Sequence, residues 1–159
     1  YKRQIIALCV NRFVLVNAEI PSGSMENTIM TGDRVFGNRL AYIFGEPKRF
    51  DIIIFRYPDD EKQLFIKRII GLPGETVEIH DGQIFIDGSK TPLKDVTTKE
   101  FMQGSFGPYT VPDNCYFVMG DNRNNSKDSR YWEHTFVTDD EIVGKAFLRY
   151  WPLNKIKFL

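Results

Sequence analysis

The stretch that decides the fold is 51–71, with the sequence Asp-Ile-Ile-Ile-Phe-Arg-Tyr-Pro-Asp-Asp-Glu-Lys-Gln-Leu-Phe-Ile-Lys-Arg-Ile-Ile-Gly. Its two halves, 51–57 and 63–70, are rich in isoleucine and aromatic residues, which favour β-strands. The Pro-Asp-Asp sequence at 58–60 is typical of a turn. The stretch therefore predicts a β-hairpin, and Lys67 falls in the middle of its second strand.

The chain beyond this hairpin continues the β pattern. Residues 76–80 and 83–86 flank an Asp-Gly pair, which favours the primed turns that match the twist of paired strands. Residues 141–150 form a further strand-like run, whereas 89–107 are polar and turn-rich and are typical of a small variable insertion. The fold class expected is mainly β, with an antiparallel sheet or barrel as its core and a small β extension.

The bulk composition narrows the class of protein. A chain of 159 residues fits one domain with a substantial apolar core. Lys plus Arg and Asp plus Glu are equal at 21 each, so the formal net charge is zero. Nucleic-acid-binding domains carry a basic patch or a high isoelectric point, so we expect no nucleic-acid partner. The 13 Phe, 7 Tyr and 2 Trp suit a β-rich protein or a surface that meets lipid or an extended peptide.

An apolar segment occupies residues 1–17. It carries Lys2 and Arg3 at its start and a second polar break at Asn11-Arg12. The apolar runs are too short for a membrane span, which needs about 20 mainly apolar residues. The residues alone leave two interpretations open: the remnant of a membrane anchor, or an amphipathic first helix that packs on the domain.

Only two cysteines occur, Cys9 and Cys115. The first lies in the apolar segment and the second at the start of a strand-like run, so we expect no disulfide between them. Their spacing matches no metal motif, and we interpret both as small buried apolar residues.

A serine, a lysine and a polar loop stand out as candidates for chemistry. They lie in Pro-Ser-Gly-Ser-Met at 21–25, in Phe-Ile-Lys-Arg at 65–68 and in the loop 120–130. A serine hydroxyl needs a base to take its proton, and a lysine can do so only when burial lowers its pKa. Side chains alternate in a strand, so Phe65 and Ile69 should flank Lys67 on its own face. This pattern suggests a Ser-Lys hydrolase.

Each of these residues also has a simpler interpretation. Ser24 could cap a short helix, and Lys67 could be a solvated charge on a strand. Mechanisms based on histidine are disfavoured, because the only histidines, His80 and His134, lie in no triad motif. Gly-x-Ser-x-Gly and Ser-x-x-Lys are absent, which removes the α/β-hydrolase and penicillin-binding signatures.

Four stretches, 20–29, 32–35, 67–75 and 120–130, resemble in sequence and order the conserved boxes of the type I signal peptidases. These are membrane-bound serine proteases that remove signal peptides from exported proteins. The resemblance extends from about Ala18 to Trp151, and its departures are small, such as Asn27 in place of a common proline and Glu75 in place of a common aspartate. It implies a signal-peptidase-like β fold that needs neither cofactor nor metal.

The resemblance also implies roles for individual residues. Ser24 would be the nucleophile and Lys67 the general base, Ser22 would share the oxyanion with the N–H of Ser24, and Ser126 would hydrogen-bond the lysine and orient it. The charged residues of the last stretch would support the site: Asp121, Arg123, Asp128 and Arg130. From strand alternation we expect Arg68 to point away from Lys67 and to form a structural ion pair with Asp121 or Asp128.

The implied substrate is an exported preprotein whose signal peptide ends in small residues of the A-x-A type. We expect it to add as an extended strand between 18–21 and 64–66. Candidate walls of its shallow pockets are Ile20, Met25, Ile29, Phe65 and Ile66, although these could equally be ordinary core.

The resemblance finally implies a domain division and a location. Residues 1–17 would be the remnant of an anchor in contact with membrane lipid, and 18–159 the catalytic domain. The full-length protein would be held in the cell membrane by a single span, with this domain on the extracytoplasmic side. Two alternatives remain open: another Ser-Lys protease, such as a self-cleaving repressor or an organellar processing peptidase, and a non-enzymatic β module that binds extended peptides.

Overall fold

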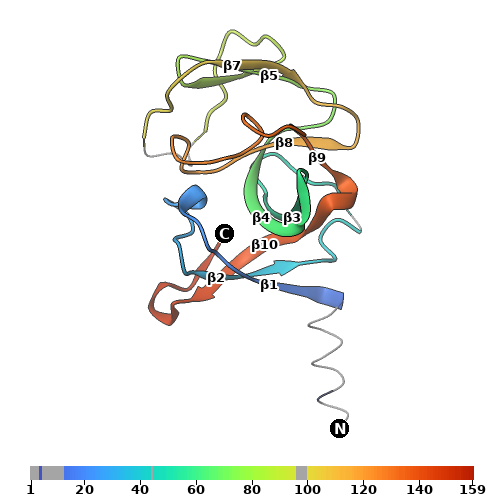
Figure 1. The fold of residues 1–159 in the computed structure, drawn as a ribbon, viewed down its shortest axis with the longest axis vertical. Helices are drawn as coiled ribbons and strands as arrows, with labels where there is room; N and C mark the ends of the chain where they lie inside the picture. The colour runs from blue at the N-terminus through green and yellow to red at the C-terminus, as the bar shows by residue number, and fades with distance from the viewer. Residues whose placement is uncertain (1–3, 5–12, 44, 96–99) are drawn as a thin grey trace.

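The computed structural model describes residues 4, 13–43, 45–95 and 100–159, and their strands form two antiparallel sheets (Figure 1). Along the larger sheet the strands follow the order β1 (Leu15–Glu19), β2 (Arg34–Asn38), β10 (Ile142–Trp151), β3 (Ile52–Tyr57), β4 (Asp60–Gly71), β8 (Cys115–Met119) and β9 (Val137–Thr138), with β11 (Lys157–Phe158) beside β10. The smaller sheet has the order β6 (Gln83–Ile86), β5 (Thr76–His80) and β7 (Phe106–Thr110). The mainly β, antiparallel fold expected from the sequence is confirmed.

The predicted hairpin is the centre of the larger sheet. Strands β3 and β4 pair antiparallel, with Ile53 opposite Lys67 and Ile54 opposite Ile66. Strand β4 begins at Asp60, three residues earlier than the sequence predicted, and its first residues are mostly exposed. Because these residues are polar, they carry no apolar signal, and only their pairing across a tight turn identifies them as a strand.

Two strand edges remain open within the described part of the sheet. Strand β4 pairs with β3 along 60–68, but it meets β8 on its other side only from Arg68 onward. The backbone of 63–66 therefore has a partner on one side only. Strand β1 pairs with β2 and ends the sheet. Open edges of this kind can accept a further strand.

The smaller sheet forms the predicted β extension. Its β5–β6 hairpin turns at Asp81 and Gly82, whose φ angles of 48° and 76° lie in the left-handed region that an Asp-Gly turn favours. Strand β7 begins inside the range 89–107 that the sequence marked as a variable insertion. Met102 from the same range is buried in the apolar cluster beneath this sheet. The insertion is therefore partly built into the core.

The end of the N-terminal apolar segment belongs to the sheet. Residues 15–17, which the sequence analysis assigned to the segment 1–17, form the first part of β1, and Val16 is buried in the core. A short apolar run has the same composition whether it is an edge strand or the end of an anchor, so only its pairing with β2 separates the two. Within the described ranges, no helix has the length and hydropathy that a bilayer crossing requires.

The two cysteine predictions have different outcomes. Cys9 lies outside the described residues. Cys115 is a free thiol at the start of β8, where it is partly buried and packs against the cluster under the smaller sheet.

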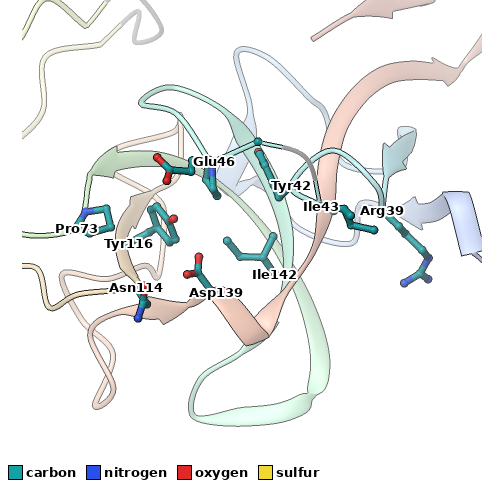
Figure 2. Close-up of a pocket in the computed structure, with 12 residues that line it drawn as sticks. Arg39, Tyr42, Ile43, Glu46, Pro73, Asn114, Tyr116, Asp139 and Ile142 are labelled. Atoms are coloured by element: carbon teal, nitrogen blue, oxygen red, sulfur yellow. The ribbon is translucent and has the colours of Figure 1, made fainter.

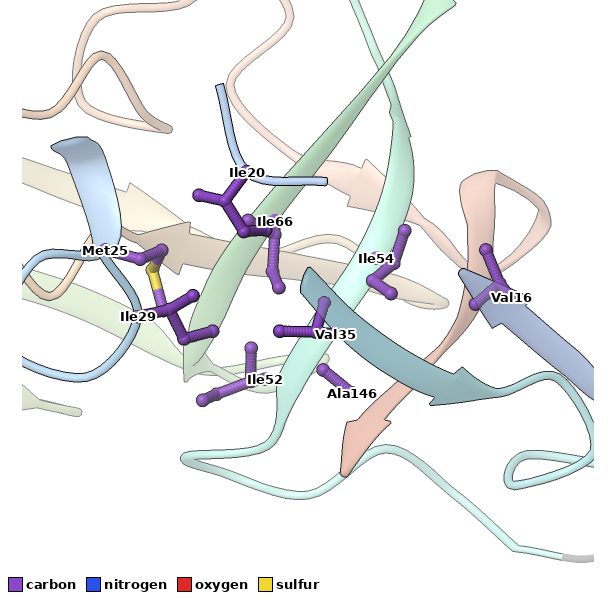
Figure 3. Close-up of a cluster of buried hydrophobic side chains, with 9 residues drawn as sticks. All are labelled: Val16, Ile20, Met25, Ile29, Val35, Ile52, Ile54, Ile66 and Ala146. Carbon is purple, nitrogen blue, oxygen red and sulfur yellow. The ribbon is translucent and has the colours of Figure 1, made fainter. Parts of the chain in front are cut away.

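A core cluster joins the first residues of the domain to the centre of the larger sheet (Figure 3). Its nine buried members come from β1, the turn that follows it, β2, β3, β4 and β10: Val16, Ile20, Met25, Ile29, Val35, Ile52, Ile54, Ile66 and Ala146. This cluster fixes the turn that carries Ser24 against the hairpin that carries Lys67.

Candidate active site

Ser24 lies within a short 3₁₀ turn, η2 (Gly23–Met25). The capping position before this turn is Ser22, and its side chain makes no capping hydrogen bond. The interpretation of Ser24 as a helix cap is therefore wrong. Met25, the next residue, is completely buried in the core, which anchors the turn and leaves the Ser24 hydroxyl directed toward β4.

The Ser24 hydroxyl and the Lys67 amine are in direct contact. Lys67 Nζ lies 2.7 Å from Ser24 Oγ and donates a second hydrogen bond of 3.2 Å to the carbonyl of Ile66. Lys67 is only 3% exposed, and its Nζ stands 5.3 Å from the centre of the Phe65 ring. Ser22 Oγ lies 3.3 Å from Ser24 Oγ. The structure thus brings together three residues that the sequence singled out.

Burial changes the acidity of this lysine. Desolvation lowers the pKa of Lys67 from 10.5 to about 8, although the negative charges of Asp128 and Asp121 act in the opposite direction. Both carboxylates are hydrogen-bonded to arginines, Asp121 to Arg68 and Asp128 to Arg130. Their charges are thereby largely balanced, so the loss of hydration dominates. An appreciable fraction of the neutral amine is then present near neutral pH.

The loop 120–130 is held in place by buried ion pairs and by hydrogen bonds between side chains and the main chain. Asp128 accepts hydrogen bonds from the Gly120 N–H at 3.0 Å and from Arg130 Nε and Nη2 at 2.8 Å each. Arg130 also donates to the Arg123 carbonyl at 2.7 Å. Arg123 forms its ion pair outside the loop, with Asp95 of the insertion. Ion pairs were expected here, but no local pattern indicates the Asp95 partner, which is 28 residues earlier in the chain.

Arg68 and Asp121 form a buried bidentate pair, which confirms the structural ion pair expected for Arg68. Both hydrogen bonds, from Arg68 Nε and Nη2 to the two carboxylate oxygens, are 2.7 Å long. Asp121 also accepts a hydrogen bond from Thr28, four residues after Ser24. The pair therefore connects β4, the loop 120–130 and the segment that follows the Ser24 turn.

Asp121→Asn is expected to lower the free energy of unfolding by about 3–5 kcal/mol, because it leaves the Arg68 guanidinium buried without its counter-charge. Urea unfolding followed by circular dichroism measures this loss. The matched control is Glu19→Gln, which breaks the exposed Glu19–Arg34 pair and should cost less than about 1 kcal/mol. Equal losses in the two variants would contradict a structural role for the buried pair.

Ser126 is buried beside Ser24 but makes no hydrogen bond to Lys67 in this structure. Its Oγ is shielded from solvent and has no hydrogen-bond partner among the described residues. Ser126 and the main chain of Ser24 both pack closely against Gly120. If residue 120 had a Cβ, that atom would lie 2.3 Å from Ser126 Oγ and 2.4 Å from the Ser24 carbonyl oxygen. Only glycine therefore allows the loop to approach the Ser24 turn this closely.

A groove of about 620 Å³ opens over the Ser24–Lys67 contact. The two open strand edges form its walls, and Ile20, Phe65 and Ile66 line it as the sequence predicted. Its other lining residues are Asn17, Ala18, Glu19, Pro21, Ser22, Gly23, Ser24, Ile54, Gln63, Leu64, Lys67, Asn125 and Lys127.

Met25 and Ile29 occupy a different position from the other candidate wall residues. Both lie in the core cluster (Figure 3). Both are 0% exposed, and neither lines the groove. Their side chains point inward because the 3₁₀ turn needs apolar anchors. Sequence reasoning could not separate a wall residue from an anchor, since both are bulky and apolar. It also missed Asn125 and Lys127, which belong to a loop whose direction only the fold supplies.

A second hollow, of about 570 Å³, shares no described lining residue with the groove (Figure 2). Tyr42, Glu46, Tyr116 and Asp139 are among its described lining residues. That lining contains no serine, cysteine, lysine or histidine. The groove above Ser24 is therefore the better candidate for nucleophilic chemistry.

The histidines take no part in the groove. His80 Nε2 lies 2.9 Å from Glu78, and His134 Nδ1 lies 2.9 Å from Asp59. Both rings are largely exposed, and neither histidine lines the groove. The expectation that no histidine serves the candidate site agrees with these positions.

Comparison with known proteins identifies the class and then the family. The model of the family "Signal peptidase, peptidase S26" matches residues 3–151. A probable signal peptidase I-2 of Synechocystis is 38% identical over 98% of this chain and 72% of its own length. Signal peptidase I of Leptolyngbya laminosa is 39% identical over 96% of this chain and 76% of its own.

A solved structure gives the same result. The crystal structure of a signal peptidase I from Enterococcus faecalis is 37% identical, covers 63% of this chain and 96% of its own, and superimposes with a TM-score of 0.54. The fold and these matches define the protein as a hydrolase, a serine endopeptidase. The chain belongs to the signal peptidase I family, peptidase family S26.

Family membership settles two of the open alternatives. The protein is an enzyme of a membrane-associated family whose members remove signal peptides, so the non-enzymatic peptide-binding module is excluded. The self-cleaving repressor is excluded for the same reason.

Proposed function

We propose that this enzyme cleaves preproteins through a Ser-Lys dyad, with Ser24 as nucleophile and Lys67 as general base. The observation that carries the proposal is the 2.7 Å contact between Ser24 Oγ and the buried Lys67 Nζ. A lysine with its pKa lowered to about 8 can supply the neutral amine that such a base requires. No histidine or carboxylate contacts the Ser24 hydroxyl among the described residues.

The reaction divides into an acylation and a deacylation step, and Lys67 Nζ carries the protons in both. Ser24 Oγ bonds to the carbonyl carbon of the scissile peptide while its proton moves to Lys67 Nζ. The ammonium then returns this proton to the leaving nitrogen, which releases the mature protein and leaves the signal peptide as an ester on Ser24. Water then attacks the ester carbonyl while Lys67 takes one of its protons. As the ester C–O bond breaks, Lys67 passes this proton to Ser24 Oγ, which releases the signal peptide with a free carboxyl group and restores the serine.

The negative oxygen formed during each attack requires donors that are already in place. We assign this role to the Ser22 hydroxyl and the N–H of Ser24. The position of Ser22 Oγ, 3.3 Å from the nucleophilic oxygen, supports the assignment. Ser24 lies in the turn that the buried Met25 anchors and Ser22 directly precedes it, so little reorganisation is needed during the reaction.

Ser126 is assigned to the orientation of Lys67. A buried hydroxyl is rarely left without a partner, and Ser126 Oγ has none among the described residues although it packs beside the Ser24 turn. A hydrogen bond between this hydroxyl and the lysine amine during proton transfer would give Ser126 its missing partner. Asp121, Arg123, Asp128 and Arg130 hold the loop that presents it.

The substrate is proposed to bind as an extended strand between 18–21 and 64–66, with small residues of the A-x-A type before the scissile bond. The unpaired side of β4 and the terminal strand β1 support this mode, because both offer main-chain groups to a peptide. Ile20 and Ile66 narrow the groove above the buried core, which leaves room for small side chains and excludes large ones.

We further propose that the enzyme acts at the cell membrane, with the domain that begins at β1 on the extracytoplasmic side and the segment before β1 in contact with lipid. The membrane association of the family and the apolar residues that precede β1 support this location. Protease accessibility in intact and permeabilised cells tests it, since protection of the domain until the membrane is opened would contradict it.

Labelling by a serine-directed acylating inhibitor tests the proposed nucleophile. We expect one adduct per chain, mapped to Ser24 by peptide mass spectrometry, and loss of cleavage of an A-x-A peptide in proportion to labelling. Lys67→Met should abolish the adduct, because an unassisted serine hydroxyl is a weak nucleophile. An adduct on another residue, with cleavage lost in parallel, would contradict the assignment.

A further inference from the structure

Lys127 lines the groove, yet the proposed reaction gives it no role. It follows Ser126 in the loop 120–130 and is exposed, whereas Ser126 is buried. Within the described part of the chain, its ammonium forms neither a hydrogen bond nor an ion pair. Lys127 therefore presents a free positive charge to whatever occupies the groove.

The loop places this charge at the Ser24 end of the groove. Ser126 and the Ser24 carbonyl both pack against the same side of Gly120. The Asn122 N–H donates a hydrogen bond of 3.0 Å to that carbonyl. Asn17 and Gln63, by contrast, lie on the strand walls that would hold the signal peptide. If those walls hold the residues before the scissile bond, as proposed, the residues after it pass Ser24 and the loop that carries Lys127.

The other charges in the groove do not cancel that of Lys127. The groove lining includes three ionisable side chains: Glu19, Lys67 and Lys127. Glu19 is paired with Arg34 at 3.3 Å, and it lies on the wall formed by β1. Lys67 is buried and acts in the proposed reaction as a neutral amine. Among the ionisable side chains that line the groove, Lys127 is therefore the exposed cation without a paired carboxylate. The Glu26 carboxylate lies against Gly23 but does not line the groove.

We propose that Lys127 is a specificity-determining residue that favours an acidic side chain, and disfavours a basic one, at the first two positions after the scissile bond. This inference rests on the proposed function of the groove. A carboxylate at either position gains an attractive interaction with the ammonium, whereas a lysine or arginine meets a like charge. Because Lys127 is exposed, the preference is moderate and sensitive to salt.

Two peptides that differ only after the scissile bond test this role. Both carry the same A-x-A segment, and the next two residues are Asp-Asp in one and Lys-Lys in the other. The measured quantity is the ratio of their kcat/KM values. For the unaltered enzyme we expect a preference of about 5-fold for the acidic peptide at low salt, falling toward unity as salt screens the charge. The ratio for Lys127→Gln should approach unity, and that for Lys127→Glu should reverse.

The ratio of the two kcat/KM values is insensitive to changes in the reactivity of the Ser24–Lys67 dyad. A charge change at Lys127 could alter the pKa of Lys67, but such an effect would act equally on both peptides at one pH. The matched control is Lys62→Gln, which makes the same change in net charge at an exposed lysine of β4 that does not line the groove. Its ratio should equal that of the unaltered enzyme.

The outcomes separate this inference from the proposed function. If the unaltered enzyme cuts both peptides and the ratio is the same in all Lys127 variants, the groove binds substrate as proposed and the role of Lys127 is overturned. If the unaltered enzyme cuts neither peptide, both proposals are overturned. A ratio that shifts as strongly in Lys62→Gln as in Lys127→Gln would also overturn the role, because it would reflect net charge alone.

Discussion

Ser24→Ala is expected to lower kcat by at least about 10⁴-fold, because removing the nucleophile of a serine protease leaves only the catalysis due to binding and oxyanion contacts. Cleavage of an A-x-A peptide under single-turnover conditions measures the loss. The change removes one oxygen from a turn that is anchored by Met25, so the urea midpoint should remain close to that of the unaltered enzyme.

The matched control for this variant is Ser22→Ala, two residues earlier in the same loop. It removes a proposed oxyanion donor and keeps the nucleophile, so kcat should fall by only about 10²–10³-fold. A Ser24→Ala enzyme that retains kcat within 10²-fold of the unaltered value would contradict the dyad, and an effect of Ser22→Ala equal to that of Ser24→Ala would contradict the separate roles.

Lys67→Met is expected to abolish activity to a similar degree, at least about 10⁴-fold in kcat, and to make the protein more stable near neutral pH. The activity is lost because no base remains beside Ser24 Oγ. Stability increases because methionine fills a similar volume but has no charged amine, so its burial carries no desolvation cost. A lysine pKa lowered from 10.5 to about 8 corresponds to a cost of up to about 3 kcal/mol in the folded state.

The stability that Lys67→Met adds should decrease as the pH rises. Below about pH 8 the lysine is charged in both the folded and the unfolded protein, so the full cost is present. Between about 8 and 10.5 the unfolded chain binds more protons than the folded one, and stability rises with pH. The advantage of Lys67→Met in urea unfolding should therefore shrink across this range. A constant advantage would contradict a lowered pKa for Lys67.

The same ionisation should control the rate. Since only the neutral amine can accept the serine proton, kcat/KM for the unaltered enzyme should rise with pH through an apparent pKa of about 8.

Ser126→Ala tests the orientation of the amine: kcat should fall by about 10²-fold with little change in KM, as expected for a misplaced catalytic group. A Ser126→Ala enzyme with the original kcat would leave Ser126 a structural role only.

Sequence reasoning located the hairpin and the residues of the candidate site because both rest on local signals. The apolar runs 51–57 and 63–70 and the turn between them correspond to β3 and β4, which place Lys67 opposite Ile53. The motif that contains Ser24 is likewise continuous. The structure adds the contact that no local pattern contains, the 2.7 Å approach of Ser24 to Lys67 across 43 residues of chain.

Sequence reasoning failed where the same residue type serves two environments. Leu15 and Val16 look like the end of an apolar anchor but form an edge strand, and Met25 and Ile29 look like pocket walls but anchor the core. Hydropathy alone cannot separate these cases, because an apolar side chain is shielded from water in either environment. The Arg123–Asp95 pair was missed for another reason: charged residues in loops can find many partners, and only tertiary structure selects one.

The two open strand edges that border the groove have a consequence for timing in the cell. A peptide can bind to such edges only while its own main-chain groups are free, so a cleavage site already folded into a helix or a sheet would be refused even with a perfect A-x-A sequence. In the proposed binding mode, the open edges of β1 and β4 would make cleavage depend on the conformation of the substrate as well as on its sequence. The enzyme would act on a newly exported chain before the first residues of the mature domain have packed.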